Sequence, residues 1–190
     1  MYKQCRTEQS AARQRQLEQK LLQVMLHRQY DEISVMELCE EMGIPRKSFY
    51  RYFSSKEGAL CALIDHTLMD YDDSVVYSIE QPGLLPQKYM ERAFLFWIEH
   101  RELLDAMARS NLYGVLVQRT IAYTREMDSM PPFMTSEDRF LRDYATMFAV
   151  SGLMSMIVRW HRDGFTKSAQ EMAKMALRLF TEPLFDLKNN

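Results

Sequence analysis

The sequence predicts an all-α protein of about nine helices, in which a small N-terminal three-helix domain is followed by a larger helical domain. Apolar residues recur at helical spacing along most of the 190 residues, and no strand alternation or hairpin signal is present. An apolar fraction of 47%, with only six Gly and six Pro, indicates a folded chain rather than a disordered one.

Three helices are expected in the first 55 residues. Apolar residues at helical spacing between residues 6 and 29 predict a first helix. Ser34 and Glu37 have the spacing of a capping box, so a short second helix begins there. Gly43 can adopt the left-handed conformation that ends this helix, and a third helix is expected over Pro45–Tyr52. Two short helices joined by a tight turn are typical of a helix-turn-helix, whose second helix enters the major groove of DNA.

The charge of the chain is unevenly distributed. Residues 1–56 carry ten Lys or Arg and seven Asp or Glu, a net charge of +3, whereas the remainder carries −5. A basic front and an acidic body suit a nucleic-acid-binding segment joined to a part that is not held to DNA. No signal peptide and no run of about 18 uncharged apolar residues is present, so we expect a cytoplasmic protein without membrane contact.

Residues 33–60, which run from Ile33-Ser34 to Ala59-Leu60, closely resemble the DNA-binding signature of the tetracycline-repressor (TetR) family of bacterial transcription regulators. The likeness includes a Tyr-x-Tyr-Phe-x-x-Lys block at residues 50–56. Pro45 replaces the usual small hydroxyl residue, and Lys47 occupies a position that is often glycine, so the operator sequence does not follow from relatives. The resemblance implies a DNA-binding domain at residues 1–55 and an effector-binding and dimerisation domain at residues 56–190.

Cationic and hydroxyl side chains of this segment are the expected DNA contacts. Arg46 and Lys47 lie in the first turn of the expected recognition helix, where long cations can reach guanine edges. The other side chains are expected to contact phosphates, and Arg51 either a phosphate or a base. The complete set is Ser34, Arg46, Lys47, Ser48, Tyr50, Arg51, Tyr52 and Lys56. Phe49 and Phe53 are assigned to the core, and the basic residues of the first helix to phosphates or to solvent.

Six further helices are expected beyond residue 55, and the body should contain helices only. Pro- and Gly-containing breaks fall at residues 81–86, 130–133 and 163–165. Ser168 and Glu171 predict a second capping box. The expected helices span residues 56–77, 86–99, 102–108, 111–127, 136–162 and 168–187.

The last two helices resemble those that pair with their twofold mates in this family, with the best local likeness at residues 151–154 and 160–164. Small residues would let helices approach closely, and large apolar ones would supply buried area. A twofold dimer also suits a palindromic operator in double-stranded DNA. The expected dimer interface comprises Gly152, Ser155, Met156, Trp160, Met172, Ala176, Leu179 and Phe180.

Fifteen methionines and several aromatic residues could line an adaptable apolar pocket, although at helical spacing such residues also form ordinary core. The polar members of the set could orient a ligand or could lie at the surface and cap helices. The expected effector-binding residues are Trp97, His100, Asn111, Tyr113, Gln118, Tyr123 and Phe148. The effector is unknown.

Enzymatic motifs are missing from the sequence. The four histidines form no His-x-x-x-His pair, and there is no nucleophile elbow or phosphate-cradling glycine loop, so no catalytic residue, metal or cofactor is expected. Three widely spaced cysteines suit a reducing compartment, and Cys39 and Cys61 fall at apolar helix positions. We expect a repressor that a small effector releases from DNA. The alternatives are an effector-independent regulator or activator and a protein-interaction module of the same fold that lost DNA binding.

Overall fold

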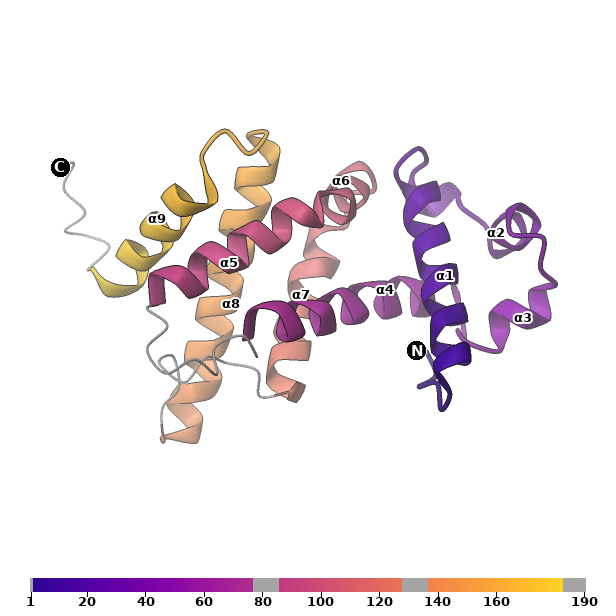
Figure 1. Ribbon diagram of the computed structural model, residues 1–190, viewed down its shortest axis with the longest axis horizontal. Coiled ribbons are helices and arrows are strands. Elements are labelled where there is room, and N and C mark those ends of the chain that lie inside the picture. Colours follow the sequence, from indigo (N-terminus) through magenta and orange to yellow (C-terminus); the bar gives the residue numbers. More distant parts are fainter. Residues whose placement is uncertain (1, 77–85, 128–136, 183–190) are drawn as a thin grey trace. The chain divides into compact units, whose positions relative to one another are not determined.

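The computed structural model describes residues 2–76, 86–127 and 137–182 (Figure 1). Within these ranges the regular structure is helical, apart from one isolated bridge between Tyr2 and Phe53. The helices are α1 (Glu8–Met25), α2 (Val35–Glu41), α3 (Arg46–Tyr50), α4 (Lys56–Tyr71), α5 (Pro86–Glu99), α6 (Arg101–Arg109), α7 (Tyr113–Met127), α8 (Arg139–Arg162) and α9 (Ala169–Thr181). A 3₁₀ turn, η1 (Tyr30–Glu32), precedes α2, and a π-helical turn, η2 (Asp72–Val76), follows α4. The all-α prediction is confirmed.

The expected helices agree with the observed ones except at their ends. α5 begins and ends where the sequence predicts, whereas α3 ends at Tyr50 instead of Tyr52. The reason is that Tyr52 N donates to Phe49 O, a tighter turn than an α-helix makes. The breaks expected at residues 81–85 and 130–133 and the helix end at residue 187 lie outside the described residues. No helix in the described ranges is both long and apolar enough to cross a membrane.

The chain divides into two compact units. Unit 1 comprises residues 1–68 and 102–119, and unit 2 comprises residues 69–101 and 120–190. The sequence places a domain boundary after residue 55, whereas unit 1 continues through most of α4 and includes α6 and the start of α7. Two helices, α4 and α7, therefore run from one unit into the other.

The core of unit 1 fixes one face of α3. Phe49 and Phe53 are buried, and their ring centroids lie 5.1 Å apart. Leu21 and Met25 of α1 are fully buried, as is Ile64 of α4. The assignment of the two phenylalanines to the core is confirmed. Cys39 is also buried, while Cys61 is half-buried.

Unit 2 is built around α5, α8 and α9. α5 packs along α9, where Ala173 and Ala176 are fully buried (Figure 1). The expected capping box at Ser168 is present: Ser168 Oγ accepts from Glu171 N at 3.2 Å, and Glu171 Oε2 accepts from Ser168 N at 2.8 Å. This cap fixes where α9 begins.

Candidate nucleic-acid interface

The turn between α2 and α3 is a Schellman motif centred on Gly43. Gly43 N donates to Glu40 O at 3.0 Å, and Ile44 N donates to Cys39 O at 2.9 Å. Gly43 has a φ of 61°, a left-handed conformation that is costly for residues with a side chain. Pro45 follows in extended conformation as the N-cap of α3. The turn therefore sets the angle at which α3 leaves α2.

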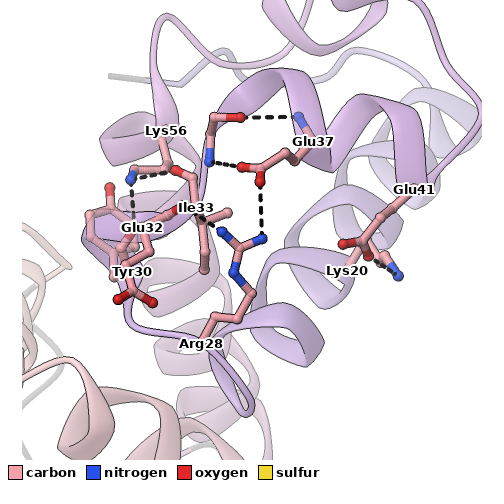
Figure 2. A network of polar contacts seen from close by, with 9 residues as sticks. Lys20, Arg28, Tyr30, Glu32, Ile33, Glu37, Glu41 and Lys56 are labelled. Carbon is pink, nitrogen blue, oxygen red and sulfur yellow. Dashed lines mark hydrogen bonds and ion pairs between the residues drawn. The ribbon is translucent and has the colours of Figure 1, made fainter.

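The start of α2 is held by the expected capping box. Ser34 Oγ accepts from Glu37 N at 3.1 Å, and Ser34 N donates to Glu37 Oε2 at 2.8 Å. Arg28, just beyond α1, donates to Glu37 Oε1 at 3.2 Å (Figure 2). Hydrogen bonds from the Ser34 side chain and backbone, and then Arg28, lower the pKa of Glu37. The hydroxyl of Ser34, an expected phosphate contact, is thus engaged as a cap acceptor, although the residue remains exposed.

The outward face of α3 carries the residues expected to read bases. Arg46 and Lys47 are exposed, and so is Tyr50. The Arg46 guanidinium lies 5.8 Å from the centroid of the Tyr50 ring, and its Nη2 donates to the Tyr50 hydroxyl at 3.4 Å. Arg46 is thereby oriented along the exposed side of the helix, opposite the buried Phe49.

The remaining expected contacts near α3 differ in exposure. Ser48 is half-buried and Arg51 is exposed. Tyr52 is only 8% exposed, and its ring centroid lies 6.3 Å from that of Phe53, so most of this side chain is core. Contact between the Tyr52 hydroxyl and a phosphate stays a prediction, and Tyr52 is among the residues that line the groove described below.

Lys56, the other expected phosphate contact, points into the protein. Its Nζ donates to Tyr30 O and to Ile33 O, both at 2.6 Å, and lies 4.2 Å from the centroid of the Tyr30 ring (Figure 2). Burial lowers the pKa of this ammonium. In this structure its hydrogen bonds go to backbone carbonyls.

A polar groove lies between the first turns of α1 and the residues that follow α3. Thr7 caps α1 by accepting from Ser10 N at 3.3 Å, so the positive end of the helix dipole lies at the groove. Arg13 and Arg51 contribute two cations, and the groove therefore favours an anion. Its lining residues are Thr7, Gln9, Ser10, Ala12, Arg13, Gln16, Arg51 and Tyr52.

Residues that precede α1 are tied to the end of α3, which the sequence did not reveal. Lys3 N donates to Tyr52 O at 2.9 Å, and the Tyr2 ring contacts His66 edge to face at 5.5 Å. A hydrogen bond between backbone groups does not depend on particular side chains, so the sequence of so short a segment does not predict it. The groove is thus bordered by a fixed N-terminal segment.

The expected effector-binding residues are not all placed as a pocket lining would require. Three aromatics are buried: Trp97 and Tyr123 in unit 2, and Tyr113 in unit 1. His100 is half-buried and stacks on Phe96 at 3.9 Å.

The other three expected effector residues are exposed. Asn111 is exposed in a left-handed conformation directly after α6, and Gln118 is exposed on α7. Phe148 is 66% exposed on α8. For these three residues a contact with an effector stays a prediction. Gln118 and Phe148 lie on the solvent-exposed sides of their helices, and Asn111 lies in the turn between α6 and α7, so helical spacing alone did not resolve which residues were buried.

Unit 2 holds a buried polar cluster at the end of α4. The hydroxyls of Tyr71 and Tyr89 lie 3.1 Å apart, and the Tyr123 hydroxyl donates to Asp72 Oδ2 at 2.9 Å. Tyr71 also contacts Phe96 edge to face at 5.2 Å. Burial raises the pKa of Tyr71 and of Tyr89, the latter to about 12. Of this cluster only Tyr123 was expected from the sequence, and the π-helical turn that presents Asp72 has no sequence signal.

The expected dimer interface is divided between core and surface. Trp160 is 2% exposed because it packs against Phe94 and Phe165 at 5.4 and 4.7 Å, and its Nε1 donates to Lys167 O. Met172 and Ala176 are also buried within the chain, so these three residues are corrected to intrachain core. Gly152 and Ser155 are exposed, and Met156, Leu179 and Phe180 are partly exposed.

α8 exposes an apolar face that the sequence analysis missed. Its members are between 43% and 72% exposed: Phe140, Leu141, Tyr144, Met147 and Phe148. A shallow depression on this face continues to the expected interface residues Gly152 and Ser155. Exposed large apolar side chains gathered on one helix mark an interaction surface.

Comparisons with known proteins cover both parts of the chain. Residues 21–63 match the family of bacterial regulatory proteins, tetR family, and residues 86–182, just over half of the chain, match the family described as transcriptional regulator C-terminal region. Over 65 residues the chain is 37% identical to the HTH-type transcriptional regulator EthR of Mycolicibacterium smegmatis. That stretch covers 34% of this chain and 30% of the relative.

Two solved structures share the fold. The fatty acid degradation regulator FadR from Bacillus halodurans superposes with a TM-score of 0.58 at 14% identity, over 90% of this chain and 95% of that one. A tetR-family transcriptional regulator from Streptomyces coelicolor gives a TM-score of 0.55 at 22% identity, over 90% of this chain and 79% of the other.

Proposed function

Because the chain belongs to the tetR family of bacterial regulatory proteins, we propose that it is a homodimeric repressor of a palindromic operator. It leaves the operator when a small apolar or amphipathic molecule occupies unit 2. As a member of this family the chain is a DNA-binding transcriptional regulator and not an enzyme.

The observation that carries the proposal is the division of α3 into a buried and a cationic face. Phe49 is buried on one side, while Arg46 and Lys47 are exposed on the other. A helix that is anchored by its apolar side can present long cations to the major groove without losing core contacts. Arg46 and Lys47 read guanine edges, and Tyr50 positions Arg46 and contacts a phosphate.

Backbone phosphates beside the major groove bind the polar groove between α1 and the end of α3. Arg13 and Arg51 supply charge there, and the α1 N-terminus supplies oriented N–H groups. These contacts carry no sequence information, and they set the register of α3 on the duplex.

Dimerisation uses the exposed face of α8 together with the exposed edge of α9. Phe140, Tyr144 and Phe148 offer aromatic area, and exposed Gly152 allows close approach of a second helix. A twofold dimer that pairs this face with its copy presents two α3 helices, one to each half-site of the operator.

The effector contacts the polar cluster at the end of α4. The Tyr71–Tyr89 and Tyr123–Asp72 pairs place hydroxyls and a carboxylate among aromatic rings, a combination suited to an amphipathic molecule. α4 begins at Lys56, in the same unit as the DNA-binding helices, and its last residue belongs to this cluster. The helix therefore connects the DNA-binding part of the chain to the proposed effector site. Release requires that the effector bind the DNA-incompatible geometry more tightly than the DNA-bound one.

Selection of genomic DNA fragments with the purified full-length protein tests the proposal. We expect enrichment of a palindromic site and protection of two half-sites about one helical turn apart. Failure to enrich any site favours the protein-interaction alternative and rejects the proposal.

A second measurement tests release. A panel of small amphipathic compounds is screened for loss of operator binding, and Tyr89→Phe and Tyr123→Phe are compared with the unmodified protein. Operator binding that no compound weakens favours the effector-independent alternative.

A further inference from the structure

The segment between α1 and α2, residues 29–34, is held by two cations, Arg28 just beyond α1 and Lys56 at the start of α4. We call this segment the connector. Lys56 Nζ donates to Tyr30 O and Ile33 O, and Arg28 Nη2 donates to Glu32 O, all at 2.6 Å (Figure 2). Three carbonyls of one short connector therefore accept hydrogen bonds from charged donors, which are stronger than bonds from neutral ones.

Lys56 is well suited to this position. Its ammonium is a compact charge with three donors, and two of them are directed at carbonyls while the charge lies 4.2 Å from the Tyr30 ring centroid. A partly buried ammonium would be costly without such partners, and the two carbonyls and the ring offset that cost.

The connector leads directly into the DNA-reading helices. Ile33, whose carbonyl Lys56 holds, is followed by Ser34, the N-cap of α2. α2 ends in the Gly43 turn, which sets the direction of α3. A shift of the connector would therefore be passed to both helices.

We propose that Lys56 is a positioning residue, which clamps the connector to the start of α4 and so fixes α2 and α3 for operator binding, instead of contacting a DNA phosphate. The inference rests on the proposed function. Through the Ile33 carbonyl it also links Lys56, the first residue of α4, to the segment that leads into α2.

Salt dependence distinguishes a clamp from a phosphate contact. A cation that neutralises a phosphate contributes about 0.9 to the slope of log Kobs against log salt concentration, because its loss leaves one counterion on the DNA. A clamp contributes nothing to this slope, since it makes no contact with DNA. Its loss lowers affinity at every salt concentration by the same factor.

The experiment compares Lys56→Met with Arg13→Met in the full-length protein, on the operator obtained by selection. Both changes remove one positive charge, but Arg13 is exposed on α1 in the groove assigned to phosphates. We expect Lys56→Met to weaken operator binding about tenfold or more with the original slope, as loss of two hydrogen bonds from a charged donor predicts. Arg13→Met should lower the slope by about 0.9. A slope that falls by this amount in Lys56→Met, or unchanged affinity, overturns the proposal.

Lys56→Arg provides a second test that keeps the charge. A phosphate contact tolerates arginine, whereas a planar guanidinium does not reproduce a compact ammonium held 2.6 Å from two carbonyls. Weakened binding with the original slope supports the clamp, and binding equal to that of the unmodified protein overturns it.

Amide hydrogen exchange without DNA separates the clamp from the proposed function. In Lys56→Met the amides of α2, such as Leu38 and Met42, should exchange faster, while those of α5 and α9 keep their rates. A uniform change would show general destabilisation and would overturn the inference. If the unmodified protein selects no operator, the proposed function fails, but this exchange pattern still tests the clamp.

Discussion

The carboxylate of Asp65 accepts two hydrogen bonds from the guanidinium of Arg119, so that α4 and α7 are bridged inside unit 1. Asp65 is almost completely buried, with 1% of its surface exposed. Arg119→Met would leave this carboxylate buried without its cation, and we expect a loss of about 3 kcal/mol in the free energy of unfolding. Urea unfolding at one fixed protein concentration measures it.

The matched control is the double variant Asp65→Asn with Arg119→Met. Because the buried charge is then removed together with its partner, much of the lost stability should return. A double variant as unstable as Arg119→Met alone would contradict the argument that an uncompensated charge causes the loss.

Alanine at Arg46 or Lys47 should weaken operator binding more than binding to unrelated DNA. Both side chains are exposed in the first turn of α3, and a base contact contributes about 1 to 3 kcal/mol of discrimination. Binding to operator and to scrambled DNA, measured at the same salt concentration, gives the ratio. Equal losses on both DNAs would assign these residues to phosphates.

Glutamine at Arg13 and at Arg51 should show the opposite pattern. The groove they line offers charge and oriented N–H groups but no element that reaches base edges. Each change should weaken specific and non-specific binding alike and lower the salt slope by about 0.9. Arg159→Gln on α8 is the control, because Arg159 is an exposed arginine in unit 2. It should change neither the affinity for DNA nor the salt slope.

Much of the DNA-binding unit could be predicted because its signals are local. The capping box at Ser34, the turn at Gly43 and the buried Phe49 each depend on a few neighbouring residues, and the structure contains all three. The role of Lys56 could not be predicted in this way. Its partners, Tyr30 and Ile33, lie more than twenty residues away, so only the folded chain brings the ammonium to their carbonyls.

Predictions for the larger domain were weaker for the same reason. Trp160 and Phe148 both occur on α8, and a sequence of apolar residues around the whole helix does not distinguish the buried side from the exposed one. In the structure Trp160 is core and Phe148 is surface. The polar cluster at Asp72 depends on a π-helical turn and on the way in which side chains of α5 and α7 pack beside it, and periodicity predicts neither the turn nor this packing.

Glu37→Gln should make stability less dependent on pH in the acidic range. The pKa of Glu37 in the folded protein is below its ordinary value of 4.5, because hydrogen bonds from Ser34 and Arg28 favour the carboxylate. The carboxylate therefore stabilises the fold above that value, and the contribution disappears as the pH falls through the folded pKa. Urea unfolding at several pH values should show a difference between variant and unmodified protein at pH 7 that vanishes in acid. A constant difference would contradict this origin.

Glutamate at Phe148 should convert the dimer into a monomer. The side chain is 66% exposed on the apolar face of α8, so the change costs little within one chain but would bury a carboxylate between two chains. Sedimentation velocity gives the mass of the species. Val115→Glu is the matched control, since Val115 is 38% exposed on α7 within unit 1 and should leave the dimer intact. Because two linked copies of α3 are required for a palindrome, the monomer should also lose most operator affinity while keeping weak binding to a half-site. A dimeric Phe148→Glu protein would place the interface elsewhere than the α8 face.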